Sequence, residues 1–212
     1  MGDWSLTWNS QTFALAPVTL TANASANVKG VWAQITAATP IEAHAIVMMI
    51  QNTAGDQMTD LAIGPDGQEH IIAPNLMVSD HINQGGKSVY PLPISIPKNS
   101  RLAARNQSTT GGATQGVAII LFNHGPGASP QMDQVVDYGT ALADSGGTGV
   151  DPGASLNAKN SWSQLVASTA RPIRALLVSI GDRANTAGTT ATWLCDVGIG
   201  PAGQEHVVVP NI

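Results

Sequence analysis

The chain has 212 residues, of which 43% are hydrophobic, so it is long enough for one large all-β domain or two smaller ones. Charged residues make up only 11%, against about 25% in an average soluble domain, and such a surface suits contact with neighbouring subunits better than a free cytoplasmic monomer. The net charge is −5 and the few lysines and arginines are not clustered, so the composition argues against a nucleic-acid partner.

The sequence carries no signal for a membrane or for export. No apolar run approaches the roughly 18 residues of a membrane span. The first ten residues lack the basic and apolar regions of a signal peptide. The single cysteine, Cys195, rules out an internal disulfide. We therefore expect a protein that is made in a cytoplasm without a signal peptide and has no membrane partner.

The first predicted element is an N-terminal strand with an aromatic face. Trp4, Leu6 and Trp8 alternate along the chain, and alternate residues of a strand share one face. Because an extended aromatic segment near a terminus can pair with a neighbouring molecule, these three residues are candidates for subunit docking.

Short apolar runs bounded by turn residues predict buried strands. The runs HAIVMMIQN, from His44, and RALLVSIGD, from Arg174, have the pattern of strands buried on both faces. The segment GVAIILFN, residues 116–123, predicts a central strand that closes the first repeat. No segment shows a convincing helical period, so the sequence predicts an all-β fold.

Prolines predict an edge strand in the segment YPLPISIP, from Tyr90. Leu92, Ile94 and Ile96 alternate with prolines and a serine, so one face is apolar. Proline cannot donate a hydrogen bond to a neighbouring strand, which confines such a segment to the edge of a sheet. After a turn, residues 101–105 alternate again and predict another strand.

A hairpin is predicted at IGPDGQEHIIAPNL, from Ile63. Pro65 fixes φ at the first central position of the turn, and Gly67 can adopt a positive φ. Residues 61–64 lead into the turn and residues 69–75 lead out of it. Asn75, directly after a proline, is expected to bond its own backbone in a loop.

The hairpin carries a Gln-Glu-His triplet that occurs twice, as Gln68, Glu69 and His70 and as Gln204, Glu205 and His206. A glutamate beside a histidine could supply a metal ligand or a general base. Adjacent residues of a strand point to opposite faces, however, so the pair cannot readily converge on one ion. We interpret the glutamines and glutamates as solvated hairpin shoulders and candidate binding residues, and the histidines as half-buried. No metal site and no cofactor are predicted.

The whole segment around this hairpin occurs twice. Residues 24–39 align with residues 154–169 without a gap, and nine of the closing sixteen residues repeat the earlier stretch. The sequence therefore predicts a tandem duplication of jelly-roll-like β-sandwich modules. The first module spans residues 1–124, a Gly/Pro-rich linker spans residues 125–132, and a second, shortened module spans residues 133–212.

The repeated tryptophans and the missing motifs bear on function. Trp32 and Trp162 recur at the same repeat position, which favours a place in the core over a sugar-stacking platform. The sequence has no nucleophile elbow, no phosphate-binding glycine loop and no cysteine or histidine cluster with metal spacing. We therefore predict that the protein is not an enzyme.

The stretches DLAIGPDGQEHIIAPNL, from Asp60, and YPLPISIPKNSRLAARNQ, from Tyr90, resemble small β-sandwich structural proteins of tailed bacteriophage virions. The likeness covers most of residues 24–123 and recurs, shortened, from 154 to 212. It implies a virion component made in the host cytoplasm, and it brings no catalytic residues.

Two functions are expected from these observations. The first is a non-enzymatic structural protein on the exterior of a phage particle, as a head decoration, head fibre or tail-surface subunit, in contact with copies of itself and other virion proteins. The alternative is a carbohydrate-binding or adhesin module with a host-surface glycan as partner, because jelly rolls are also lectin scaffolds. The fold alone does not separate the two.

The shortened second repeat leads to one more expectation. After Asn75 the first repeat continues with the strands that complete its sandwich, whereas the second repeat reaches Asn211 and Ile212 and lacks them. Its apolar strands would be left partly uncovered. We expect the cover to come from a neighbouring chain, from the N-terminal strand, or from further residues of a longer natural protein.

Overall fold

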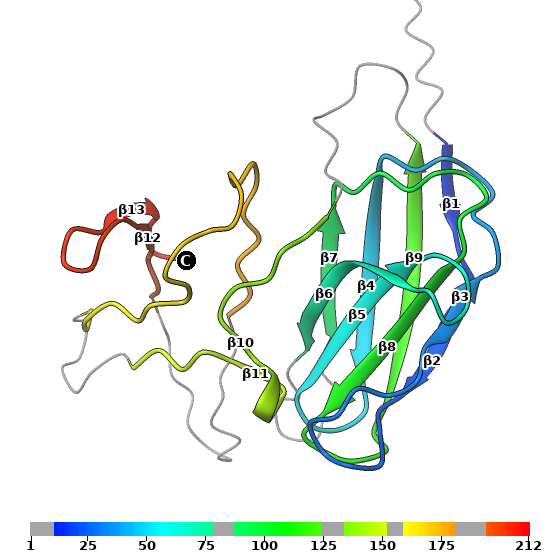
Figure 1. The fold of residues 1–212 in the computed structure, drawn as a ribbon, viewed down its shortest axis with the longest axis horizontal. Helices are drawn as coiled ribbons and strands as arrows, with labels where there is room; N and C mark the ends of the chain where they lie inside the picture. The colour runs from blue at the N-terminus through cyan, green and yellow to red at the C-terminus, as the bar shows by residue number, and fades with distance from the viewer. Residues whose placement is uncertain (1–10, 79–86, 124–133, 152–158, 181–193) are drawn as a thin grey trace, which may run out of the picture.

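The computed structural model describes residues 11–78, 87–123, 134–151, 159–180 and 194–212 (Figure 1). Trp4, Leu6 and Trp8 lie outside the described residues. The described strands are β1 (Gln11–Ala14), β2 (Val18–Thr21), β3 (Ala33–Thr36), β4 (Ala45–Asn52), β5 (Gln57–Ile63), β6 (His70–Val78), β7 (Lys87–Leu92), β8 (Leu102–Ser108), β9 (Thr114–Asn123), β10 (Thr140–Ala141), β11 (Gly146–Gly147), β12 (Val197–Ile199) and β13 (His206–Val209). In these residues the only helix is the 3-10 turn η1 (Leu142–Asp144), and none is long enough to cross a membrane.

The strands from β1 to β9 form two antiparallel sheets that face each other (Figure 1). One sheet has the order β1-β9-β4-β7, with β2 also pairing with β9, and the other has the order β3-β8-β5-β6. From β2 onward, successive strands lie in opposite sheets except at the β5–β6 hairpin. This alternation of successive strands between a five-stranded and a four-stranded sheet is the jelly-roll form of the β-sandwich. The predicted all-β sandwich is therefore confirmed.

The hydrophobic core lies between the two sheets. On β4, Ile46, Met48 and Ile50 are at most 2% exposed, whereas Met49 is 37% exposed. Leu61 of β5 and Ile72 of β6 belong to the same buried cluster from the opposite sheet. The prediction that the strand after His44 is buried on both faces is therefore wrong, because each antiparallel sheet of a sandwich turns one face to solvent.

The proline-bearing segment lies at a sheet edge, as predicted. Among the described strands, β7 pairs only with β4, and Pro91 lies opposite Val47. Leu92, Ile94 and Ile96 are buried, so the predicted alternation is confirmed. Strand β9 pairs with β4 on one side and with β1 and β2 on the other, which confirms the predicted central strand.

The second half of the chain does not form a second sandwich within its described residues, 134–151, 159–180 and 194–212. These residues contain only two short antiparallel pairs, β10–β11 and β12–β13. Residues 174–180 have no strand, and Leu176 and Leu177 are 48% and 52% exposed. The prediction of a doubly buried strand there is wrong for the described residues, because no second sheet packs on this segment. The tandem duplication remains a prediction from the sequence.

We expect the sandwich to lose stability when its core is truncated. Ile119→Ala, at a fully buried position of β9, should lower the free energy of unfolding by about 2–5 kcal/mol, because the cavity does not fully collapse. Val89→Ala, at a 61% exposed position of β7, should change it by less than about 0.5 kcal/mol. Chemical denaturation measures both values, and equal effects of the two substitutions would contradict the assigned core.

Candidate interaction site at the two hairpins

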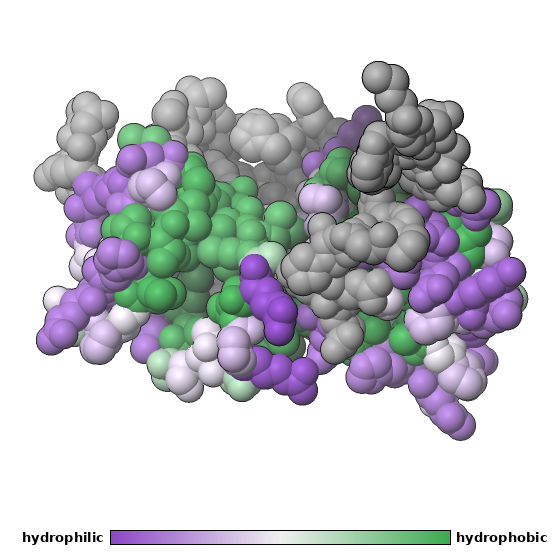
Figure 2. Space-filling view, turned by 90° about the horizontal axis from the view of Figure 1, so that it is seen from above, coloured by the Kyte–Doolittle hydropathy of each residue, from purple (hydrophilic) through white to green (hydrophobic). Residues whose placement is uncertain are grey.

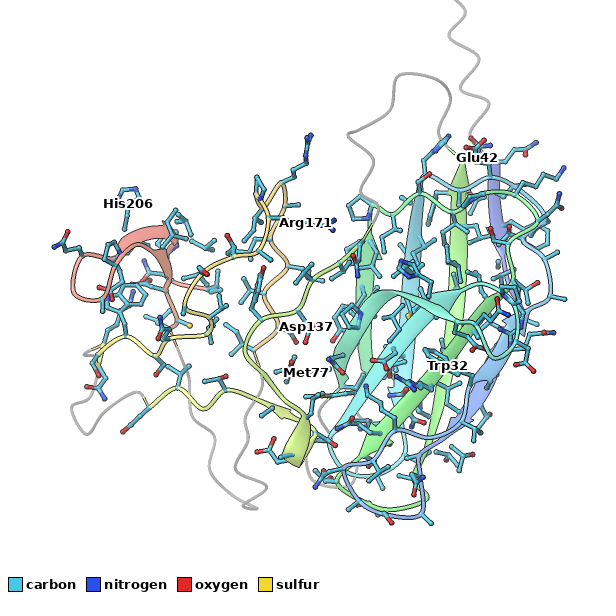
Figure 3. The ribbon with its side chains drawn as sticks, viewed as in Figure 1. Trp32, Glu42, Met77, Asp137, Arg171 and His206 are labelled. Carbon is cyan, nitrogen blue, oxygen red and sulfur yellow. The ribbon has the colours of Figure 1, made fainter. Side chains whose placement is uncertain are left out.

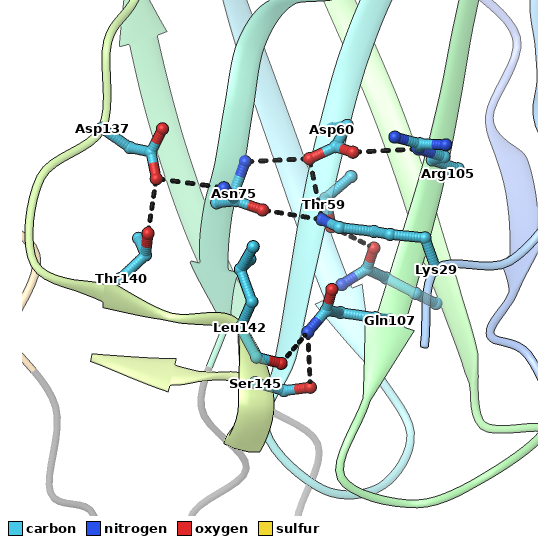
Figure 4. A network of polar contacts seen from close by, with 11 residues as sticks. Lys29, Thr59, Asp60, Asn75, Arg105, Gln107, Asp137, Thr140, Leu142 and Ser145 are labelled. Atoms are coloured by element: carbon cyan, nitrogen blue, oxygen red, sulfur yellow. Dashed lines mark hydrogen bonds and ion pairs between the residues drawn. The ribbon is translucent and has the colours of Figure 1, made fainter. Parts of the chain in front are cut away.

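A buried carboxylate holds three separate segments together beside the β5–β6 hairpin (Figure 4). Asp60 on β5 has a side chain that is 3% exposed. Its Oδ1 accepts hydrogen bonds from Lys29 Nζ at 2.7 Å and from the backbone N–H of Asn75 at 3.0 Å. Its Oδ2 accepts one from Arg105 Nε at 2.9 Å. The carboxylate is therefore neutralised from both sides.

Each cation of this cluster has a second partner. Lys29 also donates to Asn75 Oδ1 at 2.8 Å, and the Arg105 guanidinium lies 4.4 Å from the centre of the Trp32 ring. Burial lowers the pKa of Lys29, and the Asp60 carboxylate offsets part of that effect. Trp32 is thus partly buried under Arg105, and the prediction that it lies in the core is wrong.

The same cluster fastens residues 135–145 to the sandwich. Asn75 Nδ2 donates to Asp137 Oδ2 at 3.0 Å, and the Thr140 hydroxyl donates to the same oxygen (Figure 4). Gln107 on β8 donates to the Leu142 carbonyl oxygen at 2.9 Å and contacts the Ser145 hydroxyl at 3.1 Å. In Figure 3, Asp137 lies at the boundary between the sandwich and the second half of the chain.

The Asn75 prediction is corrected by these contacts. Asn75 lies within β6 and has φ of 48°, but its side chain bonds Lys29 and Asp137 and not its own backbone. Asparagine tolerates this left-handed conformation better than most residues, which explains its presence inside a strand. Asn211 has the same conformation, with φ of 51°.

The turn of the hairpin is fixed by Arg101. Its Nη1 donates to Glu69 Oε1 at 3.0 Å and to the Gly64 carbonyl oxygen at 3.2 Å, and its Nη2 contacts Asp66 at 3.0 Å. Asp66 is 89% exposed, whereas the Glu69 side chain is 4% exposed. Gly67 has φ of 76°, as predicted, but the Gln68 N–H donates to the Pro65 carbonyl oxygen at 3.0 Å. Asp66 and Gly67 are therefore the central residues of the turn, and the prediction of Pro65 at the first central position is wrong.

Glu69 is therefore not the solvated shoulder that the sequence suggested. Burial raises the pKa of Glu69, but hydrogen bonds from its own N–H, from Arg101 and from the Gly67 N–H outweigh burial and hold the pKa below its usual value. Gln68 is exposed, as predicted. His70 is exposed as well, so its predicted half-buried place is wrong.

Part of this arrangement recurs at the β12–β13 hairpin. Lys159 Nζ contacts Asp196 Oδ1 at 2.5 Å and Asn211 Oδ1 at 2.7 Å, and the Asn211 N–H donates to Asp196 Oδ1 at 2.8 Å. The Gly203 N–H donates to Glu205 Oε1 at 3.0 Å, as the Gly67 N–H does to Glu69 at 3.3 Å. Lys159 and the Asn211 N–H keep the pKa of Asp196 below its usual value.

The arginine contacts of the first hairpin do not recur among the described residues of the second hairpin. Among the described residues, no arginine contacts Asp196, Glu205 or Trp162. Trp162 is 44% exposed, so its predicted core position is wrong, and its ring packs against Gly198 of β12. Gln204 and His206 are exposed, and His206 points away from the rest of the molecule (Figure 3).

Sequence reasoning named the hairpin glutamates but missed Lys29, Asp60, Arg101 and Arg105, the residues that bind around them. One signal could have found three members of the network. Lysine, aspartate and asparagine recur at aligned positions in both hairpins, whereas the exposed Asp66 is replaced by Ala202. Recurrence of polar residues at fixed offsets marks a shared contact set.

The ion pairs and hydrogen bonds of the first hairpin hold neighbouring strands together. Every carboxylate of the first hairpin is bound by a cation or by backbone N–H groups. Within the described residues, no group of three or more His, Cys, Asp or Glu side chains could hold a metal ion. The surface beside Gly64 and Arg101 is a shallow, open depression, lined also by Ile63, His70 and Ser100.

Comparison with known proteins gives only distant likenesses. No protein-family model matches the sequence, and no curated protein matches it. Two solved structures of infectious bursal disease virus, of the Gx and Gt strains, are similar at 12% identity with TM-scores of 0.30 and 0.31. They match 57% and 56% of this chain, which spans 33% of each of those chains. Likenesses at this level carry no argument about function.

Removal of the Asp60 carboxylate should destabilise the sandwich strongly. Asp60→Asn leaves Lys29 and Arg105 as partly buried cations without a counter-charge, and we expect a loss of about 3 kcal/mol in the free energy of unfolding. The matched control is Asp66→Asn, at an exposed ion pair, with an expected loss below about 1 kcal/mol. Urea denaturation of both variants would contradict the proposed role of Asp60 if the two losses were alike.

Glu69 should contribute to acid unfolding. Its pKa is lower in the folded chain than its ordinary value of 4.5, so its stabilising effect is present above that value and is lost as the pH falls through the lower folded value. Glu69→Gln should therefore flatten the loss of stability between roughly pH 5 and pH 3. Asp66→Asn serves as the control, and an unchanged acid slope in Glu69→Gln would show that Glu69 ionisation is not coupled to folding.

Proposed function

We propose that the protein is a non-enzymatic structural component of a virus particle, on the exterior of a tailed phage as a head decoration, head fibre or tail-surface subunit. It works through contacts with copies of itself and with other virion proteins, and it is made in the host cytoplasm. The observation that carries this proposal is the large apolar surface of the second half of the chain.

Hydrophobic residues gather on the side of the molecule formed by the second half (Figure 2). Leu176, Leu177 and Val178 are 48%, 52% and 37% exposed, and Val207 and Val208 are 39% and 43% exposed. An exposed apolar surface of this kind is typical of a protein–protein interaction site. Burying it against another subunit would be favourable at about 25 cal/mol per Å².

The low charge of the chain supports the same proposal. With 11% charged residues, few charges oppose the approach of a second subunit. Eight-stranded jelly rolls occur in viral capsid and lectin domains, so the fold is compatible with a particle subunit without requiring one. The sequence resemblance to tailed-phage structural proteins supports the particle subunit over the lectin.

Self-association through the second half is the first expected outcome. Sedimentation velocity of the full chain should show oligomers at micromolar concentration, and Leu176→Ser combined with Leu177→Ser should weaken association roughly tenfold or more. Val89→Ser, at a 61% exposed position of β7 on the sandwich, is the control and should leave association unchanged. If the protein stayed monomeric at every concentration, that result would contradict a function based on contacts between copies of the chain.

The proposal that the protein is part of a virus particle is tested by a separate measurement. Antibodies against the purified protein should label the outside of intact particles that are produced from the genome carrying this gene, and capsid or tail genes should flank it. Recovery of the protein only in the particle-free fraction would contradict the assignment. Saturable binding on a glycan array, lost in Trp162→Ala, would favour the adhesin alternative.

A further inference from the structure

In the part of the chain that the structure describes, no strand lies beside one edge of the C-terminal hairpin. Strand β5 pairs with β6 on one side and with β8 on the other. Strand β12, which aligns with the end of β5, pairs only with β13 among the described residues. The backbone groups of Cys195 and Ile212 extend that same pair. The edge that corresponds to the β8 side of β5 is therefore open.

The side chains at this open edge match those that β8 binds in the first hairpin. Arg105 of β8 contacts the second carboxylate oxygen of Asp60, and Arg101, just before β8, contacts Glu69. Asp196 and Glu205 occupy the corresponding positions, and no contact among the described residues involves the Oδ2 atom of Asp196. Two carboxylates thus recur without the arginines.

The aromatic partner of Arg105 recurs too. Trp32 stacks with the guanidinium at 4.4 Å, whereas Trp162 at the aligned position is 44% exposed and has no described cation near its ring. Lys159 and Asn211 nevertheless hold Asp196 as Lys29 and Asn75 hold Asp60. The residues of the acceptor side are thus held in place although no described strand pairs with this edge, which distinguishes them from a chance cluster of acids.

We propose that the open edge of β12 is an acceptor site for an extended segment of another polypeptide that carries two arginines four residues apart, with apolar residues between them. The segment would add a strand to the β12–β13 hairpin, with backbone hydrogen bonds along β12. One arginine would bind Asp196 and Trp162, and the other would bind Glu205. This site does not depend on the assignment to a virion.

The pairing of β5 with β8 supplies the expected register. Asp60 lies opposite Arg105, Ala62 lies opposite Ala103, and Thr59 lies opposite Asn106. In the C-terminal hairpin the same register places Asp196 opposite the second arginine. It also places Cys195, the single cysteine of the chain, opposite the residue that follows that arginine.

A peptide with the sequence of residues 100–108, SRLAARNQS, is the probe. Calorimetric titration into the full chain should give saturable binding of one peptide per chain, since the equivalent edge of β5 is already filled by β8. A peptide with both arginines replaced by glutamine should bind roughly tenfold more weakly or worse, as should the chain variants Asp196→Asn and Glu205→Gln. Asp66→Asn is the matched control and should bind as the unmodified chain does.

The register can be tested with the native thiol. An Asn106→Cys peptide, supplied as its mixed disulfide with glutathione, should exchange with the Cys195 thiol, forming the peptide–chain disulfide and releasing glutathione. A Gln107→Cys peptide supplied in the same form, whose sulfur points to the other face, should form roughly tenfold less of that disulfide. Cys195→Ser chain should form none. Absence of peptide binding, equal binding of the glutamine peptide, or equal cross-linking of the two thiol peptides would each overturn the proposal. If Asp196→Asn disturbs the hairpin, the Glu205→Gln variant still tests the proposal. Among the described residues, the Glu205 carboxylate accepts a hydrogen bond only from its own turn.

Discussion

The carboxylate of Asp60 is a charge buried within a sheet, and much of the surrounding structure serves to neutralise it. Its partners come from three places: Lys29 from the loop before β3, Arg105 from β8, and the backbone N–H of Asn75 on β6. A shift of β8 by one residue would turn Arg105 to the opposite face and leave the charge uncompensated, at a cost of several kcal/mol. The cluster therefore selects the strand register as well as stabilising it.

Polar contacts beyond the Asp60 carboxylate also fix the position of part of the second half of the chain. Asn75 joins Lys29 on one side to Asp137 on the other, and Gln107 reaches Leu142 and Ser145. Residues 135–145 are thus attached through polar groups on β6 and β8 and through Val135, which packs against the hydrophobic core of the sandwich. Their placement follows from the sandwich and not from an apolar core of their own.

The sequence predicted features that depend on local pattern. The alternation of Leu92, Ile94 and Ile96 follows from the period of a strand. The positive φ of Gly67 in the hairpin turn follows from its lack of a Cβ atom. Partners distant in the chain were not predicted, such as Arg101 for Glu69, because a period carries no information on which strands become neighbours. The run from Arg174 failed for a related reason, since an apolar pattern leads to burial only where another sheet is present.

The sheet edges of the sandwich are protected in different ways. Pro91 interrupts donation along β7, and the Val135 N–H donates to the Ile72 carbonyl oxygen, so residues 135–145 cover part of the β6 edge. The open edge of β12 lies in the other half of the chain. A segment bound at this edge would therefore run antiparallel to β12, as β8 runs antiparallel to β5. The contact would join two unlike surfaces and would leave the strand pairing of the sandwich unchanged.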